Sequence, residues 1–202
     1  MILSIDDQRR VSAAIKAAET QTAGEIVCVL ARASSDYMTY AIAWSGLVAL
    51  ATPWLLIAVT HLSVQQILLV QAFVFAALYF LFSESRLRHL LVPRGVRRQQ
   101  AHRAAMEQFM IRGMARKENR AGVLIFVSLA EHYVRIVADV GIASKVDQSV
   151  WQGAVNALLG HIQSGDMATG FVSAVEQCGV VLGQHFPPRD GEDELPDHIY
   201  FI

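Results

Sequence analysis

Charged residues are scarce in this chain, and one long stretch has none. Asp, Glu, Lys and Arg make up 17% of the 202 residues, against about 25% in typical soluble domains. Between Tyr37 and Ser83 there is no Asp, Glu, Lys or Arg at all. The apolar fraction of 53% is concentrated in that stretch, and the rest has the composition of a normal globular domain. The length then suits one ordinary domain joined to a membrane element.

Cysteine is almost absent, and several short motifs of common enzymes are absent altogether. Only two cysteines occur, Cys28 and Cys178, so no disulfide framework is implied and both are interpreted as buried reduced thiols. No HxxxH, HExxH or paired CxxC spacing exists, which argues against a zinc site. A GxSxG elbow and a phosphate-binding loop are missing too, so nucleophilic and nucleotide-binding chemistry have no motif support. The first residues, MILSIDDQRR, do not read as a signal peptide.

Two apolar runs fill the charge-free stretch and predict a transmembrane helical hairpin over residues 37–83. Crossing the hydrocarbon core takes about 20 helical residues. Met38–Thr60 has that length, and Val64–Phe82 follows after a turn of a few residues. The alternatives are two buried core helices of a soluble protein, or a re-entrant or peripheral hairpin. We favour the hairpin because two adjacent charge-free runs of this length rarely coexist in a small soluble core.

Arginines gather directly after the second apolar run. Residues 84–120 contain ten Lys or Arg against three acids, beginning with Arg86, Arg88, Arg94, Arg97 and Arg98. By the positive-inside rule these arginines stay in the cytoplasm, where they also attract anionic lipid headgroups. We therefore expect a multi-pass protein of the inner (plasma) membrane with both termini cytoplasmic. A protein-docking surface is the next alternative, and nucleic-acid binding is not expected because no aromatic residues are interleaved.

The remaining sequence predicts a small α/β domain that the hairpin splits into residues 1–36 and 84–186. A first helix has an N-cap at Ser4 and closes near Ala23. Short β-branched runs predict buried strands, and the second and third should form a hairpin because about two residues separate them. The expected strands are Glu25–Ala31, Gly122–Ala130 and Tyr133–Ala138, and further helices are expected over Gly95–Ala115, Val146–Ile162 and Phe171–Leu182.

The C-terminal segment, residues 187–202, has a composition of its own. It begins with two prolines, carries five acids and ends in the apolar residues Ile199-Tyr200-Phe201-Ile202. We interpret it as an acidic, solvated tail. A docked or partner-binding terminal strand is the alternative.

Several local sequences occur together in a distinctive order. Residues 23–27 read AGEIV at the first strand, residues 121–132 read AGVLIFVSLAEH through the strand hairpin, and residues 134–141 read VRIVADVG. Gly165-Asp166 and Gly170 follow between the last two helices. With this order of elements, residues 1–36 and 95–186 resemble the TPM domain family, named for thylakoid lumen, photosystem II repair and receptor-modulator proteins. The resemblance implies a small α/β sandwich, with calcium binding and acid phosphatase activity in some members and membrane-associated assembly or repair in others.

Two departures from the family pattern weaken a transfer of phosphatase activity. The glycine-rich turn after the third strand reads Asp139-Val140-Gly141-Ile142-Ala143-Ser144 here, with one glycine and without the later acidic residue. The membrane hairpin is inserted after the first strand. That insertion would place the domain in the cytoplasm rather than in a lumen or periplasm.

Three acidic residues are the candidate metal ligands. Asp139 ends the third strand, and α/β domains place ligands beyond the ends of their strands. Together with Asp147 and Glu131 it would offer the oxygen ligands that calcium prefers. The alternative is that Asp139 caps a turn and that Asp147 lies near a helix start, where the helix dipole favours a carboxylate.

The sequence thus predicts a membrane-anchored cytoplasmic binding or assembly module of TPM-like type, and leans away from an enzyme. Its expected partners are the lipid bilayer and another membrane or cytoplasmic protein. The competing hypothesis is a membrane-tethered, metal-dependent phosphatase or hydrolase that uses Asp139 and Asp147. The sequence alone names neither the partner nor the oligomeric state.

Overall fold

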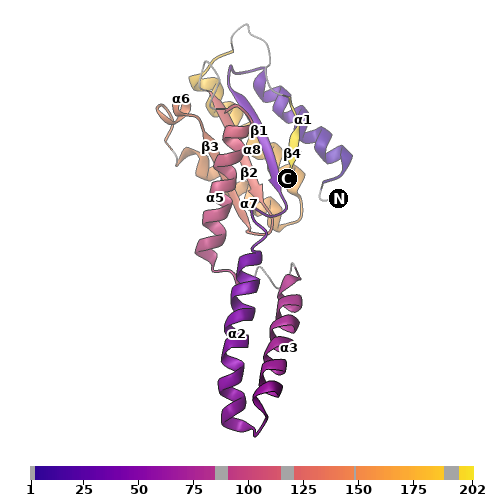
Figure 1. Ribbon diagram of the computed structural model, residues 1–202. Helices are drawn as coiled ribbons and strands as arrows, with labels where there is room; N and C mark the ends of the chain where they lie inside the picture. The colour runs from indigo at the N-terminus through magenta and orange to yellow at the C-terminus, as the bar shows by residue number, and fades with distance from the viewer. Residues whose placement is uncertain (1–2, 85–90, 115–120, 148, 189–195) are drawn as a thin grey trace. The chain divides into compact units, whose positions relative to one another are not determined.

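The computed structural model describes residues 3–84, 91–114, 121–147, 149–188 and 196–202. The chain divides into two compact units, one formed by residues 1–34 and 100–202 and the other by residues 35–99. The first is a mixed α/β domain and the second holds a pair of helices (Figure 1). The expected fold class, a small α/β domain interrupted by a helical hairpin, is confirmed.

The α/β unit alternates helices and strands in the expected chain order. The second part of this unit starts at residue 100, inside helix α5, which begins at Arg94. The elements are α1 (Ile5–Glu19), β1 (Glu25–Ala31), α5 (Arg94–Ile111), β2 (Gly122–Ser128), β3 (Tyr133–Ala138), α6 (Val140–Ala143), α7 (Val150–Gln163), α8 (Met167–His185) and β4 (Ile199–Phe201).

The four strands form one sheet in the order β3-β2-β1-β4. β1 and β2 run parallel over seven residue pairs, from Glu25 opposite Gly122 to Ala31 opposite Ser128. β2 and β3 form the predicted antiparallel hairpin. β4 pairs parallel with β1, so the interpretation of residues 187–202 as a solvated tail is wrong for their last part. The docked strand is the alternative that holds, because an apolar run gains more from pairing with an open sheet edge than from water.

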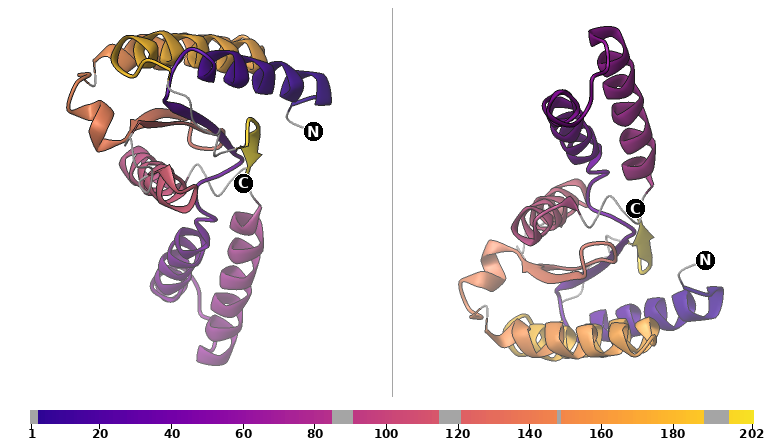
Figure 2. Two further views of the ribbon diagram at one scale, coloured as in Figure 1. Left: turned by 90° about the horizontal axis from the view of Figure 1, so that it is seen from above. Right: turned by 90° about the horizontal axis from the view of Figure 1, so that it is seen from below.

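Both faces of the sheet are covered, which explains why β1 and β2 are buried at every position and carry a polar side chain only at one end, Glu25 in β1 and Ser128 in β2. Cys28 and Leu30 of β1 pack into one core with α1, α7 and α8. Val27 and Val29 point the other way and pack with Ala105 and Phe109 of α5. The result is a layer of three helices, the sheet, and α5 on the far side (Figure 2).

The sequence predicts the N-terminal end of α1 correctly but places its C-terminal end too far along the chain. Ser4 caps the helix as expected, and Asp7 completes a capping box with it. The C-terminal end lies at Glu19 rather than near Ala23. The backbone leaves the helix early because Ala23 N–H and the Thr22 hydroxyl both donate to the carbonyl of Phe186, at 3.0 and 2.6 Å.

The second unit contains α2 (Met38–Val59) and α3 (Val64–Ser83), which pack against each other. Ser63 and Gln66 form a capping box at the start of α3. Along α2 the residues Ala41, Ser45 and Ala49 are buried, one helical turn apart. Small side chains at this spacing let two helices approach closely.

Both helices are long and apolar enough to cross a membrane, by length and composition. Their side chains are mostly exposed: only 11% of the most apolar window of α2 is buried, and 6% in α3. Trp54 of α2 and Phe73 of α3, for example, are 79% and 73% exposed. Such exposure does not fit core helices of a soluble domain, which bury their apolar surface.

Candidate functional site

The carboxyl ends of the two parallel strands lie side by side, since Ala31 of β1 is in register with Ser128 of β2. Ligands of α/β sheets bind in this kind of place, beyond the carboxyl ends of parallel strands. Three polar side chains meet there: Ser34 after β1, Ser128 at the end of β2, and Glu131 in the turn before β3. This Ser34–Ser128–Glu131 cluster is the candidate functional site.

Glu131 is the centre of the cluster and is only 7% exposed. Its two carboxylate oxygens accept the backbone N–H of Ser34, at 3.0 and 3.1 Å. The Ser128 hydroxyl donates to the same carboxylate, and the Ser34 hydroxyl donates to the Ser128 oxygen at 2.9 Å. A buried carboxylate is tolerated when hydrogen-bond donors surround it. The arrangement ties the chain after β1 to the β2–β3 turn.

His132, which follows Glu131 in the turn, has a strained backbone conformation. His132 has a φ of 49°, in the left-handed region that non-glycine residues rarely adopt. The side chain of His132 is exposed, and its N–H donates to the carbonyl of Leu129 at 3.1 Å. Strained residues persist where the surrounding structure holds them, and the buried Glu131 next to it supplies that restraint.

The other two candidate ligands lie elsewhere. Asp139 caps the short helix α6, with the Val140 N–H at 2.6 Å from its Oδ1. It stands at the opposite end of β3 from Glu131, roughly 20 Å away at about 3.4 Å per residue. The three acids therefore do not surround one ion. The described residues contain no group of three or more His, Cys, Asp or Glu side chains placed to hold a metal.

Asp147 lies on the surface just after α6 and Val146. Its Oδ1 accepts the Ser149 N–H at 2.8 Å. The backbone N–H and the hydroxyl of Ser149 hold the pKa of Asp147 below its usual value by bonding to the charged form. Asp139 thus caps α6, in line with the alternative interpretation, and Asp147 bonds to Ser149, the residue that precedes α7.

Of the five arginines expected at the lipid surface, three lie in α5 and two, Arg86 and Arg88, fall outside the described residues. Arg94, Arg97 and Arg98 occupy the first turns of the helix, where no acidic residue accompanies them. Positive charge at a helix N-terminus opposes the helix dipole. The interaction with the helix dipole therefore does not explain why three arginines stand at the start of α5.

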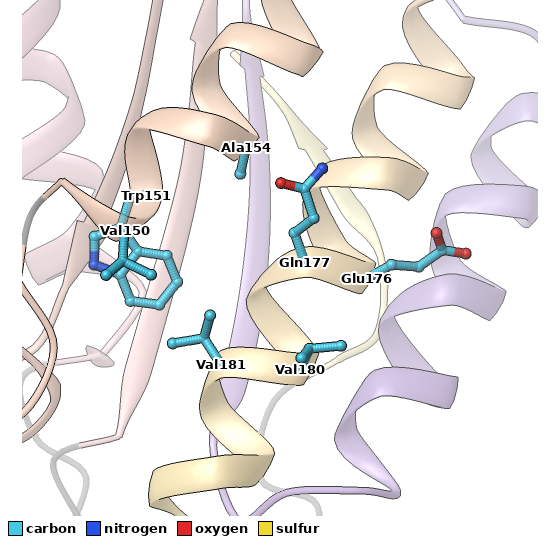
Figure 3. Close-up of a pocket in the computed structure, with 7 residues that line it drawn as sticks. All are labelled: Val150, Trp151, Ala154, Glu176, Gln177, Val180 and Val181. Carbon is cyan, nitrogen blue, oxygen red and sulfur yellow. The ribbon is translucent and has the colours of Figure 1, made fainter.

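A shallow apolar groove of about 340 Å³ runs between α7 and α8 (Figure 3). Trp151 forms its floor and is 2% exposed, whereas Val150 and Val180 at the rim are 48% and 62% exposed. Glu176 and Gln177 of α8 also line the groove. The small side chain of Ala154 also lines the groove.

Sequence reasoning missed both serines of the cluster. Ser128 lacks the motif of a nucleophilic serine, and Ser34 has no motif around it. Their positions relative to the strands would have indicated them. Ser34 follows β1 and Ser128 ends β2, just as Asp139 follows β3. Ligands bind beyond the carboxyl ends of strands that run parallel. β1 and β2 form such a pair, and Ser34 and Ser128 lie at their carboxyl ends.

The chain is similar to known proteins in two respects. The family model described as TPM domain (TPM_phosphatase) matches residues 84–181. Among solved structures, the chain resembles the NMR structure of BA42 protein from the psychrophilic bacteria Bizionia argentinensis sp. nov.. The TM-score is 0.60 at 20% identity, over 98% of this chain and 94% of that chain, and at that identity the likeness concerns the fold. No curated protein matches the chain.

Proposed function

We propose that this chain, whose residues 84–181 belong to the TPM domain family, is a membrane-anchored cytoplasmic binding or assembly module. The observation that carries the anchor is the exposed apolar surface of α2 and α3. Helices of 22 and 20 residues are about 33 and 30 Å long at roughly 1.5 Å per residue, against about 30 Å of hydrocarbon.

The polar groups of the hairpin also suit lipid. The hydroxyls of Ser45, Thr52 and Ser83 donate to carbonyls of their own helix, at 2.7, 3.0 and 2.7 Å. In hydrocarbon a hydroxyl without an acceptor would cost several kcal/mol. Internal satisfaction of these donors supports a hairpin that lipid surrounds.

The orientation follows from the charges at the two ends of the hairpin. The turn at residues 60–63 carries no Lys or Arg, whereas α5 begins with three arginines. The positive-inside rule then gives an inner (plasma) membrane protein with both termini in the cytoplasm. The unfavourable position of these arginines on the helix dipole fits a role as a lipid-facing anchor.

The binding role is assigned to the groove between α7 and α8. It offers apolar surface at Val150 and Val180, which are exposed although a valine gains from burial. Another membrane or cytoplasmic protein is the expected partner. A photo-cross-linking residue at Val180 should give a defined adduct in native membranes, and the same residue at the exposed Met110 of α5 is the matched control.

A topology map tests the anchor independently. Reporter fusions after residues 35, 62 and 100 should place the first and third in the cytoplasm and the second outside it. Extraction of native membranes with alkaline carbonate should leave the chain in the pellet. Release of the intact chain into detergent-free buffer would refute the anchor, and adducts that form equally at Val180 and Met110 would refute the groove.

A metal-dependent phosphatase is the second candidate, and the printed name of the matched family, TPM_phosphatase, is what favours it. Asp139 and Asp147 would be its acidic residues. The full chain in detergent should then hydrolyse a generic phosphomonoester with calcium or magnesium, and Asp139→Asn should remove that turnover. We expect no metal-dependent turnover, because the Asp139 carboxylate caps α6 and the Asp147 carboxylate accepts the N–H of Ser149.

A further inference from the structure

The C-terminal strand β4 is a short addition to the edge of the sheet. Ile199, Tyr200 and Phe201 lie opposite Cys28, Val29 and Leu30. Beyond the strand the Ile202 N–H donates to the Leu30 carbonyl at 3.1 Å, and the Ile202 carbonyl accepts the Arg32 N–H at 2.9 Å. A three-residue edge strand is an element that opens locally at low cost.

The edge of β1 continues beyond the reach of β4, and a side chain covers it there. Glu25 donates its N–H toward β2, to the carbonyl of Ala121, so the next residue, Ile26, directs its N–H to the β4 side. That N–H binds Oε1 of Glu19 at 2.8 Å. The end of α1 therefore supplies the acceptor that a longer β4 would have supplied.

The second oxygen of Glu19 meets another acid. Oε2 of Glu19 and Oδ1 of Asp197 are both buried, and no donor in the described residues bonds to either. The two side chains are within hydrogen-bond contact of each other. Two carboxylates can form that bond only if one of them carries a proton. Asp197 stands two residues before β4, so the contact joins the strand to α1.

We propose that Glu19 and Asp197 share one proton that latches β4 onto the edge of β1, so that the C-terminal strand docks with uptake of a proton and leaves with its release.

The surroundings of the pair favour the protonated form. Among the residues that the structure describes, the titratable groups that act on Glu19 are Asp197, Glu25 and Cys28, and these three are acids rather than cations. Burial raises the pKa of Glu19 to about 9, the bond to Asp197 adds to the rise, and the Ile26 N–H opposes it. The proton therefore stays on the pair at neutral pH while β4 is docked.

The sign of the pH effect follows from these values. When β4 leaves, water reaches Glu19 and its pKa returns toward the ordinary 4.5. A raised pKa in the docked state stabilises docking fully below about pH 4.5, and this stabilisation is lost as the pH rises to about 9. Within that window the docking equilibrium constant falls by up to about tenfold per pH unit, because each departing strand releases one proton.

Hydrogen exchange on the full chain in detergent tests the latch. Protection factors, which correct for the intrinsic pH dependence of exchange, are measured for the amides of Arg32 and Ile202 between pH 6 and pH 9. The wild type should lose up to about tenfold protection per pH unit. Glu19→Gln should remove this slope, since an amide accepts from Ile26 and donates to Asp197 at every pH. Asp197→Asn replaces the other carboxylate of the pair with an amide and should remove the slope as well.

The exposed Glu176→Gln is the matched control and should keep the wild-type slope. The proposal is overturned if the wild type shows no slope, or if both Glu19→Gln and Asp197→Asn keep it. Amides of the β2–β3 hairpin report on the domain as a whole. If they lose protection together with Arg32 and Ile202, the domain opens globally and the latch is rejected.

Discussion

The carboxylate of Glu131 accepts the backbone N–H of Ser34, although 97 positions separate the two residues in the chain. The bond crosses from the β2–β3 turn to the segment that follows β1, and the Ser128 hydroxyl completes it. A charged acceptor makes hydrogen bonds of this type worth about 1.5–3 kcal/mol each when a partner is lost. The contact therefore joins the segment that follows β1 to the β2–β3 turn at the same end of the sheet.

Glu131→Ala should lower the free energy of unfolding by about 2–4 kcal/mol, because the Ser34 N–H and the Ser128 hydroxyl lose their acceptor inside the protein. Glu131→Gln keeps one acceptor oxygen and should cost about half as much. Denaturant unfolding of the detergent-solubilised chain measures both. Glu107→Gln on the exposed side of α5 is the control and should stay within about 0.5 kcal/mol of the wild type. Equal stability of the Ala variant and the control would contradict this role.

Phe73→Arg tests the proposal that α3 faces lipid. Phe73 is 73% exposed near the middle of the helix, where an arginine costs about 2.5–3.5 kcal/mol of insertion free energy. The fraction of chain that resists carbonate extraction should fall. Ser83→Arg at the end of α3 extends the basic flank and should insert normally. A Phe73→Arg chain that stays fully integrated would count against lipid on this face.

Two neighbouring positions of α2 distinguish the helix seam from the outer face. Ser45 is fully buried, whereas a Cβ at Gly46 would meet no atom within 4 Å. Ser45→Leu should overpack the seam and destabilise the hairpin by about 1–3 kcal/mol, and Gly46→Leu should not. Thermal unfolding in detergent compares the two. The reverse order of stabilities would show that the helices pack through another face.

Glycines in α7 and α8 provide a second matched pair. A Cβ at Gly170 would lie 2.8 Å from Leu158 and 2.9 Å from His161, while one at Gly160 would meet nothing within 4 Å. Gly170→Ala should therefore cost about 1–3 kcal/mol. Gly160→Ala should add up to about 1 kcal/mol through helix propensity. Chemical denaturation gives both values, and a neutral Gly170→Ala would mean that α7 and α8 are free to separate.

The two cysteines should be inert in the folded protein. Both are fully buried, and burial raises the pKa of Cys178 to about 12 and that of Cys28 well above its usual value. The reactive thiolate is therefore suppressed at pH 8. A thiol reagent should label neither residue until denaturant is added and then label both. Labelling of either cysteine under native conditions would show that the core opens on the time scale of the reaction.

The sequence predicted both ends of β1, Glu25 and Ala31, because the apolar pattern of this strand follows directly from its buried place in the sheet. A strand buried on both faces has an almost continuous apolar sequence, here Ile26 to Ala31 after Glu25. Gly24 precedes this run and Arg32 follows it, so both ends can be recognised. The short helix α6 was not predicted, since four residues are too few for a periodic pattern. The end of α1 was misplaced because its position depends on Phe186, far along the chain.

Long-range contacts also explain why the grouping of the polar side chains could not be predicted from the sequence. Glu131 and Asp139 are close in sequence, yet an extended strand lies between them and carries them apart. Ser34 and Glu131 are distant in sequence, yet the parallel register of β1 and β2 brings them together. The docking of β4 depended on an unpaired edge of β1, which no pattern within residues 187–202 can reveal.

The place of the hairpin within the sheet topology determines the order in which the chain can assemble. β1 is complete at Ala31, and its neighbour β2 begins only at Gly122, after α2 and α3 have been synthesised. At about 5–20 residues per second, β1 waits roughly 5–18 s for that neighbour. Both helices are complete before the first inter-strand bond can form, so in the anchored protein that we propose, the hairpin enters the membrane before the domain folds.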